Sequence, residues 1–143
     1  MKIIKVINNE EKKKITRAIL EALPEWFGIV AAREEYILDS VGKDFFCAME
    51  KDKVVGFLYL KQTGKDTIEL AVMGVLKEYH RKGIGRALFE YAKESIKESG
   101  YSFIHFPLYF PLRIQIMLFQ FLYDDILLTH PLQLVQPYLY PFV

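Results

Sequence analysis

Two glycines and three basic residues lie together in one short stretch: Arg81, Lys82, Gly83, Gly85 and Arg86. A glycine has no side chain to hold a ligand away from the backbone, so consecutive N–H groups there can converge on an anion. The positive end of the helix that follows and the charges of the basic side chains favour the same ligand. The stretch therefore predicts a phosphate-binding turn, and a pyrophosphate is the ligand that fits it best.

Two common nucleotide-binding motifs do not match this stretch. A P-loop requires a Lys-Ser or Lys-Thr pair after its glycines, and none follows here. A dinucleotide-binding fold requires a third glycine at the position of Leu88 and a strand-first β-α-β unit with an acidic residue further on, and it does not fit either. An ordinary glycine-containing turn with solvated basic side chains is the remaining alternative.

The hydrophobic pattern on either side predicts the elements that position the turn. Alternating and β-branched residues predict strands, and apolar residues at helical spacing predict helices. The predicted elements are a strand at 2–7, helices between Asn8 and Pro24 and within 28–38, strands at 44–50, 53–61 and 67–75, a helix from Gly83 to Gly100 and a strand at 101–106. This order, β-α-α-β-β-β-α-β, predicts an α/β (α+β) fold with a mixed, mostly antiparallel sheet flanked by helices.

The composition changes abruptly after Phe106. Residues 101–143 hold only three charged side chains, Arg113, Asp124 and Asp125, but five of the six prolines. We expect a single domain over 1–143 in which 107–143 is aberrant, because a shift of reading frame near residue 105 would explain the loss of lysine and of pattern together. A pair of buried strands that closes the core is the alternative for this tail.

Composition limits the classes of function. The formal net charge is +1, and nothing in this balance predicts a nucleic-acid or membrane partner, which would require a clustered positive field. No apolar stretch reaches the ~20 residues of a transmembrane helix, and no secretory signal is expected at the N-terminus. The single cysteine, Cys47, excludes an internal disulfide and favours a cytoplasmic location. His105 and His130 have no partner at ligand spacing, so we predict no metal site.

Three segments in a fixed order carry a family resemblance: Val-Val-Gly-Phe-Leu at 54–58, Met-Gly-Val at 73–75 and His-Arg-Lys-Gly-Ile-Gly-Arg-Ala-Leu at 80–88. Through them the sequence resembles the GNAT superfamily of N-acetyltransferases over residues 1–106. The resemblance implies that acetyl-CoA is the cofactor and that its acetyl group passes to a primary amine of a small-molecule or peptide acceptor. A catalytically impaired acyl-CoA-binding remnant or sensor is the alternative, because the family's C-terminal tyrosine segment has no match after Phe106.

The resemblance also implies which residues hold the cofactor. The family motif Gln/Arg-x-x-Gly-x-Gly/Ala falls on 80–85, with His80 in place of Gln or Arg. The pyrophosphate is then expected on the backbone amides of 81–86, and the pantetheine arm along the backbone of Met73 and Val75. The predicted cofactor-binding residues are Met73, Gly74, Val75, His80, Arg81, Lys82, Gly83, Ile84, Gly85, Arg86 and Ala87.

Three further residues are implied for the reaction and its acceptor. Glu69 is similar to the catalytic glutamate base of some family members, and an ordinary solvated glutamate is the alternative. Strand alternation is expected to place Glu69 on one face with Ala71 and Met73. Trp26 and Phe27 lie in the loop that borders the acceptor pocket in the family and are expected to bind substrate, with core packing as the alternative. An exposed apolar tail would also favour a homodimer.

Overall fold

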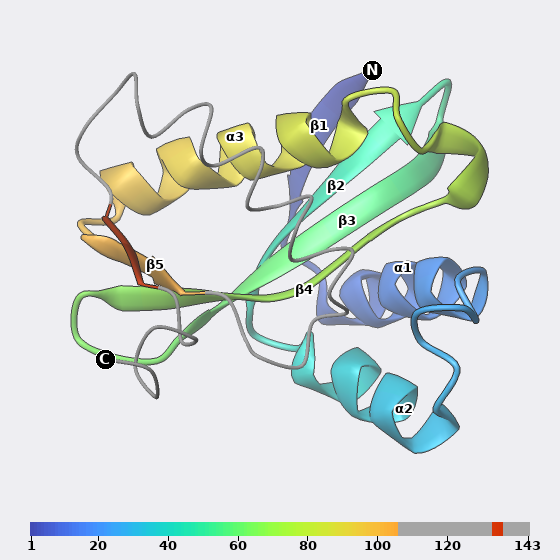
Figure 1. Ribbon diagram of the computed structural model, residues 1–143, viewed down its shortest axis with the longest axis horizontal. Helices are drawn as coiled ribbons and strands as arrows, with labels where there is room; N and C mark the ends of the chain where they lie inside the picture. The colour runs from blue at the N-terminus through green and yellow to red at the C-terminus, as the bar shows by residue number, and fades with distance from the viewer. Residues whose placement is uncertain (106–132, 136–143) are drawn as a thin grey trace.

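A single sheet organises the part of the chain that the computed structural model describes, residues 1–105 and 133–135 (Figure 1). Its strands are β1 (Lys2–Val6), β2 (Asp44–Glu50), β3 (Lys53–Gln62), β4 (Thr67–Val75), β5 (Phe103–His105) and β6 (Gln133–Val135), in that spatial order. The helices are α1 (Asn9–Glu21), α2 (Val30–Asp39), the short 3₁₀ helix η1 (Lys77–Tyr79) and α3 (Ile84–Glu98). Strands β1 to β4 pair antiparallel, whereas β4–β5 and β5–β6 are parallel.

The predicted fold class and the order of elements through β5 are confirmed. Local signals act as expected: the Asn8 side chain caps α1 by accepting from the Glu11 N–H at 3.0 Å, and Lys51 and Asp52 both take positive φ in the β2–β3 hairpin turn. Strand β6 was not predicted, because three residues between Pro131 and Pro137 carry too little pattern to indicate a strand. The other residues of 107–143 lie outside the described part of the chain, so the reading-frame hypothesis stays a hypothesis.

Helices cover both faces of the sheet (Figure 1). Helix α3 lies on one face, and its side chains Leu88, Ala92 and Ile96 join a core cluster with alternate residues of β2, β3 and β4. Helices α1 and α2 lie on the other face, where Ile19 and Leu20 join the second cluster. Strand alternation divides the core residues between these two clusters, so nearly every inward side chain of the central strands is buried.

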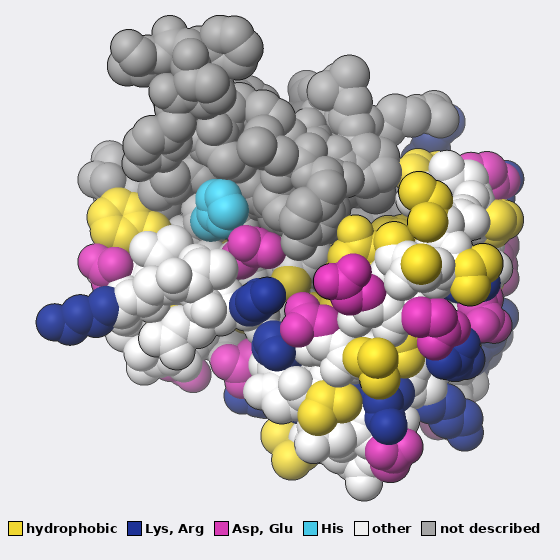
Figure 2. All heavy atoms as spheres, turned by 90° about the horizontal axis from the view of Figure 1, so that it is seen from below, with side chains coloured by type: hydrophobic (Ala, Val, Ile, Leu, Met, Phe, Trp, Pro, Cys, Tyr) yellow, Lys and Arg dark blue, Asp and Glu magenta, His cyan; other side chains and the backbone are white. Residues whose placement is uncertain are grey.

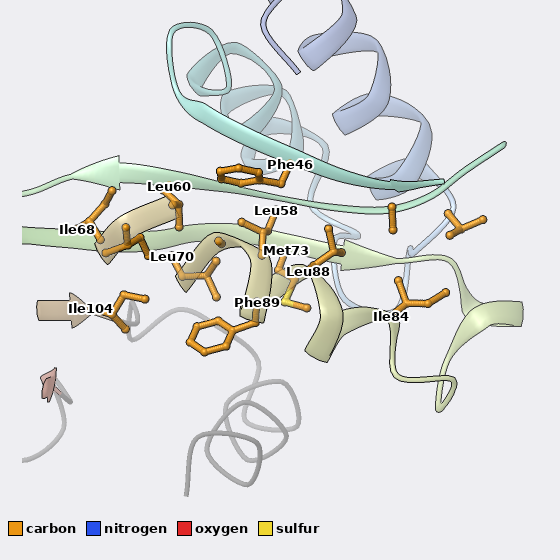
Figure 3. Packing of buried hydrophobic residues seen from close by; sticks show 14 residues of the cluster. Phe46, Leu58, Leu60, Ile68, Leu70, Met73, Ile84, Leu88, Phe89 and Ile104 are labelled. Carbon is orange, nitrogen blue, oxygen red and sulfur yellow. The ribbon is translucent and has the colours of Figure 1, made fainter. Parts of the chain in front are cut away.

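A β-bulge interrupts this alternation in β4. Leu60 of β3 pairs with Leu70 and Tyr59 pairs with Val72, which leaves Ala71 as the extra residue. Ala71 and Val72 consequently both face α1, and Met73 turns to the α3 side, where it lies near Leu88 (Figure 3). The expectation that Met73 shares a face with Glu69 is therefore wrong, because a one-residue bulge inverts the pattern beyond it.

Helix α1 packs closely against the end of β4. An added Cβ at Gly74 would lie 2.9 Å from Cγ2 of Ile19 and 3.3 Å from Cε1 of Phe57. Gly74 therefore allows the approach of the helix to the strand, since a larger residue would push α1 away.

The face on the α2 side mixes hydrophobic side chains with acidic and basic ones (Figure 2). Ile29, Val30 and Leu38 are among the exposed large hydrophobic residues there. In the described residues, no helix combines the length and the apolar character needed to cross a bilayer.

Replacing Leu88 by Ala should lower the free energy of unfolding by about 2–5 kcal/mol, because Leu88 is fully buried and its loss leaves a cavity under α3. The matched control is Leu38→Ala on α2, where the side chain is 68% exposed and the expected change is within about 0.5 kcal/mol. Urea denaturation measures both, and equal losses for the two variants would contradict this packing.

Burial also predicts the reactivity of Cys47. Its side chain is fully buried against α1, and desolvation raises the pKa of its thiol to about 11. We expect no reaction with Ellman's reagent at pH 8 in the native state and stoichiometric reaction in urea. Rapid labelling of the native protein would contradict this placement.

Candidate functional site

The connection between β4 and α3 has an unusual backbone conformation. After η1, Arg81 takes a φ of 60° and Gly83 a φ of 77°, whereas Lys82 between them is not among the positive-φ residues. Alternation of left-handed and ordinary conformations turns successive N–H groups toward one point and forms an anion-binding concavity. Arg81 adopts this conformation at a steric cost, which a non-glycine residue bears mostly at functional sites.

The start of α3 faces the same point. Gly83 is the N-cap residue of α3, and no side chain there forms a capping hydrogen bond. The first backbone hydrogen bond of the helix runs from the Ala87 N–H to the Gly83 carbonyl at 3.0 Å. The N–H groups of Gly83, Ile84 and Gly85 consequently lack an acceptor within the helix, at the positive end of its dipole. The Ala87 N–H is already bonded, and the Ile84 side chain is buried in the core.

The glycine at 85 allows a close approach inside the turn. An added Cβ there would lie 2.8 Å from Cε of Met73, so α3 begins in contact with β4. Arg81, Lys82 and Arg86 are exposed around this junction. Lys82 Nζ lies 5.2 Å from the centre of the Tyr79 ring, which places its positive charge beside the turn. The predicted glycines and basic residues therefore lie together around the start of α3.

The edge of β4 that faces β5 has only a short strand pairing in the described residues. The Leu76 N–H donates to the Val55 carbonyl of β3, and alternate residues direct their backbone groups to the same edge. Met73 and Val75 consequently direct theirs toward the β5 side, while Gly74 directs its own toward β3. The described pairing with β5 covers Thr67 to Glu69, so from Leu70 to Val75 no described strand pairs with β4 on that side.

His80 connects this edge to the loop between α1 and α2. Its Nε2–H donates to the Val75 carbonyl at 2.6 Å, and its ring meets Trp26 edge-on with centroids 5.5 Å apart. An ion pair between Lys77 and Glu25 ties the same two segments, and it holds the pKa of Glu25 below its usual value. The His80 side chain therefore hydrogen-bonds the end of β4 and holds it close to the start of the turn.

The two aromatic residues expected to bind substrate differ in position. Trp26 is partly exposed beside His80. Phe27 is 7% exposed and packs edge-on against Tyr36 at 6.0 Å, within the cluster that α1 covers. Of the pair, only Trp26 is placed to meet a ligand directly.

Glu69 lies beside His105 in the last pair of β4 and β5 that the structure describes. Its Oε2 atom is 3.2 Å from Nδ1 of His105, its register partner on β5, and the two side chains are 13% and 27% exposed. From the sequence, His105 was expected only as a histidine without metal-binding partners. The parallel register of 67–69 with 103–105 brings it beside Glu69, but hydrophobic periodicity does not predict which strands are neighbours. Among the described residues, no group of three His, Cys, Asp or Glu side chains comes together as a metal site.

Known proteins share the sequence pattern and the fold of this chain. Residues 12–107 match the Acetyltransferase (GNAT) family. No curated protein sequence matches the chain. Among solved structures, an IAA acetyltransferase from Bacillus cereus is 24% identical with a TM-score of 0.54, and the alignment covers 71% of this chain and 61% of that one. An aminoglycoside 6'-N-acetyltransferase from Enterococcus faecium is 24% identical with a TM-score of 0.59, with coverage of 71% and 58%.

A third structure contains the cofactor. The PaiA N-acetyltransferase from Thermoplasma acidophilum, in complex with coenzyme A, is 19% identical with a TM-score of 0.53, and the alignment covers 70% of this chain and 75% of that one. These structures show the same fold, and this chain spans about three fifths of the length of the Bacillus cereus and Enterococcus faecium proteins. With the family match over most of its length, the chain belongs to the GNAT acetyltransferase family.

Proposed function

We propose that this protein transfers an acetyl group from acetyl-CoA to a primary amine of an acceptor still to be identified. The observation that carries the proposal is the order of three features. The turn of 81–85 follows the part of β4 that no described strand pairs on the β5 side, and Glu69 precedes that part of β4. A cofactor with a pyrophosphate at one end and a thioester at the other fits this order.

The turn would hold the pyrophosphate and β4 the pantetheine arm. The N–H groups of Gly83, Ile84 and Gly85 would donate hydrogen bonds to the phosphate oxygens, and the exposed Arg81 and Lys82 would balance the negative charge of the phosphates. Met73 and the N–H of Val75 pair with the amide groups of the arm, while Gly74 acts through packing against α1. Val75 lies six steps along β4 from Glu69, which is about 20 Å at a strand rise of ~3.3 Å per residue. The extended arm is of similar length, so its thioester would reach the neighbourhood of Glu69.

The bound cofactor supplies a carbonyl carbon joined to a good leaving group. The chain supplies position and proton transfer: β4 fixes the thioester, and Glu69 promotes removal of the proton from the attacking amine. Fixing the reactants in this way removes much of the entropic barrier.

The acceptor side would be formed around Trp26. Its partly exposed indole borders the turn, and Phe27 supports the loop from beneath through its contact with Tyr36. The named activities of the related structures point to amines on aminoglycosides and proteins, so a test panel should include an aminoglycoside, a polyamine and a peptide with a free N-terminus. We assign the whole chain to a single acetyltransferase-like domain.

Gly83→Asp tests the phosphate site. Aspartate tolerates the left-handed conformation and can cap α3, but its charge would occupy the place of the pyrophosphate. The Kd for CoA should rise at least about tenfold relative to Gly83→Asn, which has a similar shape without the charge, an energy difference of about 1.4 kcal/mol. Isothermal titration calorimetry measures both, and equal affinities would exclude this turn as the pyrophosphate site.

Glu69→Gln tests the reaction. The variant should lose about 10²–10⁴-fold in kcat with an unchanged Kd for CoA, since proton transfer is impaired and the proposed cofactor-binding residues are intact. Amine-dependent thiol release measures turnover, and the exposed Glu94→Gln on α3 is the control. A wild-type protein that binds CoA without turnover on any amine would instead indicate an acyl-CoA-binding protein.

A further inference from the structure

The contact between Glu69 and His105 restricts the chemistry of the imidazole. An ionised carboxylate only accepts hydrogen bonds, so the Nδ1 atom at 3.2 Å from Oε2 must carry the hydrogen. In a neutral imidazole the lone pair is then on Nε2. Among the described residues, Glu69 is the hydrogen-bond partner of the His105 side chain.

Exposure distinguishes the two groups further. The Glu69 side chain is 13% exposed and that of His105 is 27% exposed, so the imidazole is the more accessible partner. Both side chains belong to the last register pair of β4 and β5 in the described residues. A carboxylate on Nδ1 fixes the tautomer and the ring orientation, and it stabilises the imidazolium that forms when Nε2 takes a proton.

We infer that His105 is the catalytic base of the transferase and that Glu69 is a positioning residue that acts through it. The inference rests on the proposed acetyl transfer and names the group that receives the proton. As the amine nitrogen bonds to the thioester carbonyl carbon, its N–H bond breaks and the proton joins Nε2. The C–S bond then breaks, and the departing sulfur takes the proton from Nε2 to give the CoA thiol. Nε2 therefore returns to its neutral form, and no other reactant is needed.

The decisive variant is His105→Asn. Its side-chain amide keeps a donor near the position of Nδ1 for Glu69 but has no group that takes a proton, so β5 stays paired while the base is lost. We expect kcat to fall about 10²–10⁴-fold with the CoA affinity unchanged. The double variant Glu69→Gln/His105→Asn should be no slower than the slower single variant, because the two residues act as a unit. Ser102→Ala, at an exposed position just before β5, is the control that should retain wild-type turnover.

Two readouts separate this role from a structural one. Imidazole added to His105→Ala should restore part of the thiol release, whereas added imidazole should leave Glu69→Gln unchanged. The ¹⁵N resonances of the His105 ring, assigned by their loss in His105→Asn, should show hydrogen on Nδ1 in the wild type.

The outcomes are distinct. If His105→Asn keeps its kcat within twofold while Glu69→Gln is impaired, Glu69 is itself the base and the inference is wrong. Hydrogen on Nε2 instead of Nδ1 in the wild type also overturns it. If the wild-type protein binds CoA and turns over no amine, the proposed function fails and this assignment with it.

Discussion

The register that joins β3, β4 and β5 is the constraint on which the rest of the candidate site depends. Parallel pairing aligns Glu69 with His105, the last pair of this ladder in the described residues. The bulge at Ala71 follows two residues later and changes the faces of β4 beyond it, so that Met73 lies on the α3 side. An extended ligand with amide groups can pair with the backbone groups of a strand edge that no neighbouring strand uses.

The two helical layers hold this strand edge in place. Gly74 lets α1 approach the same strand, and Met73 fills the space beneath the start of α3. The first turn of α3 thus packs directly on β4, which would fix the proposed phosphate site relative to the strand edge. The same segment of β4, Met73 and Gly74, therefore packs against the helices on both faces of the sheet and belongs to the strand that would bind the cofactor.

Much of this was predictable from the sequence, and the failures have definable causes. Periodicity placed the first five strands and three helices, and Gly83 and Gly85 indicated the turn at the start of α3, because both signals are local. The bulge was missed because Ala71 has no side-chain feature that distinguishes an extra residue from an ordinary one. The contacts of His80 with Val75 and of Glu69 with His105 were missed for another reason. The first depends on how the turn folds back, and the second on which strands are neighbours, so neither leaves a trace in spacing. Strand β6 was missed because its three residues carry too little pattern.

The left-handed conformation of Arg81 places folding stability and ligand binding in opposition. Right-handed conformations are favoured for side-chain-bearing residues by about 1–2 kcal/mol, so the chain folds against this preference at an exposed position. A glycine there would relieve the strain but would remove a guanidinium from the turn. Selection for thermal stability alone should therefore favour substitutions at this residue, and selection for activity should reject them.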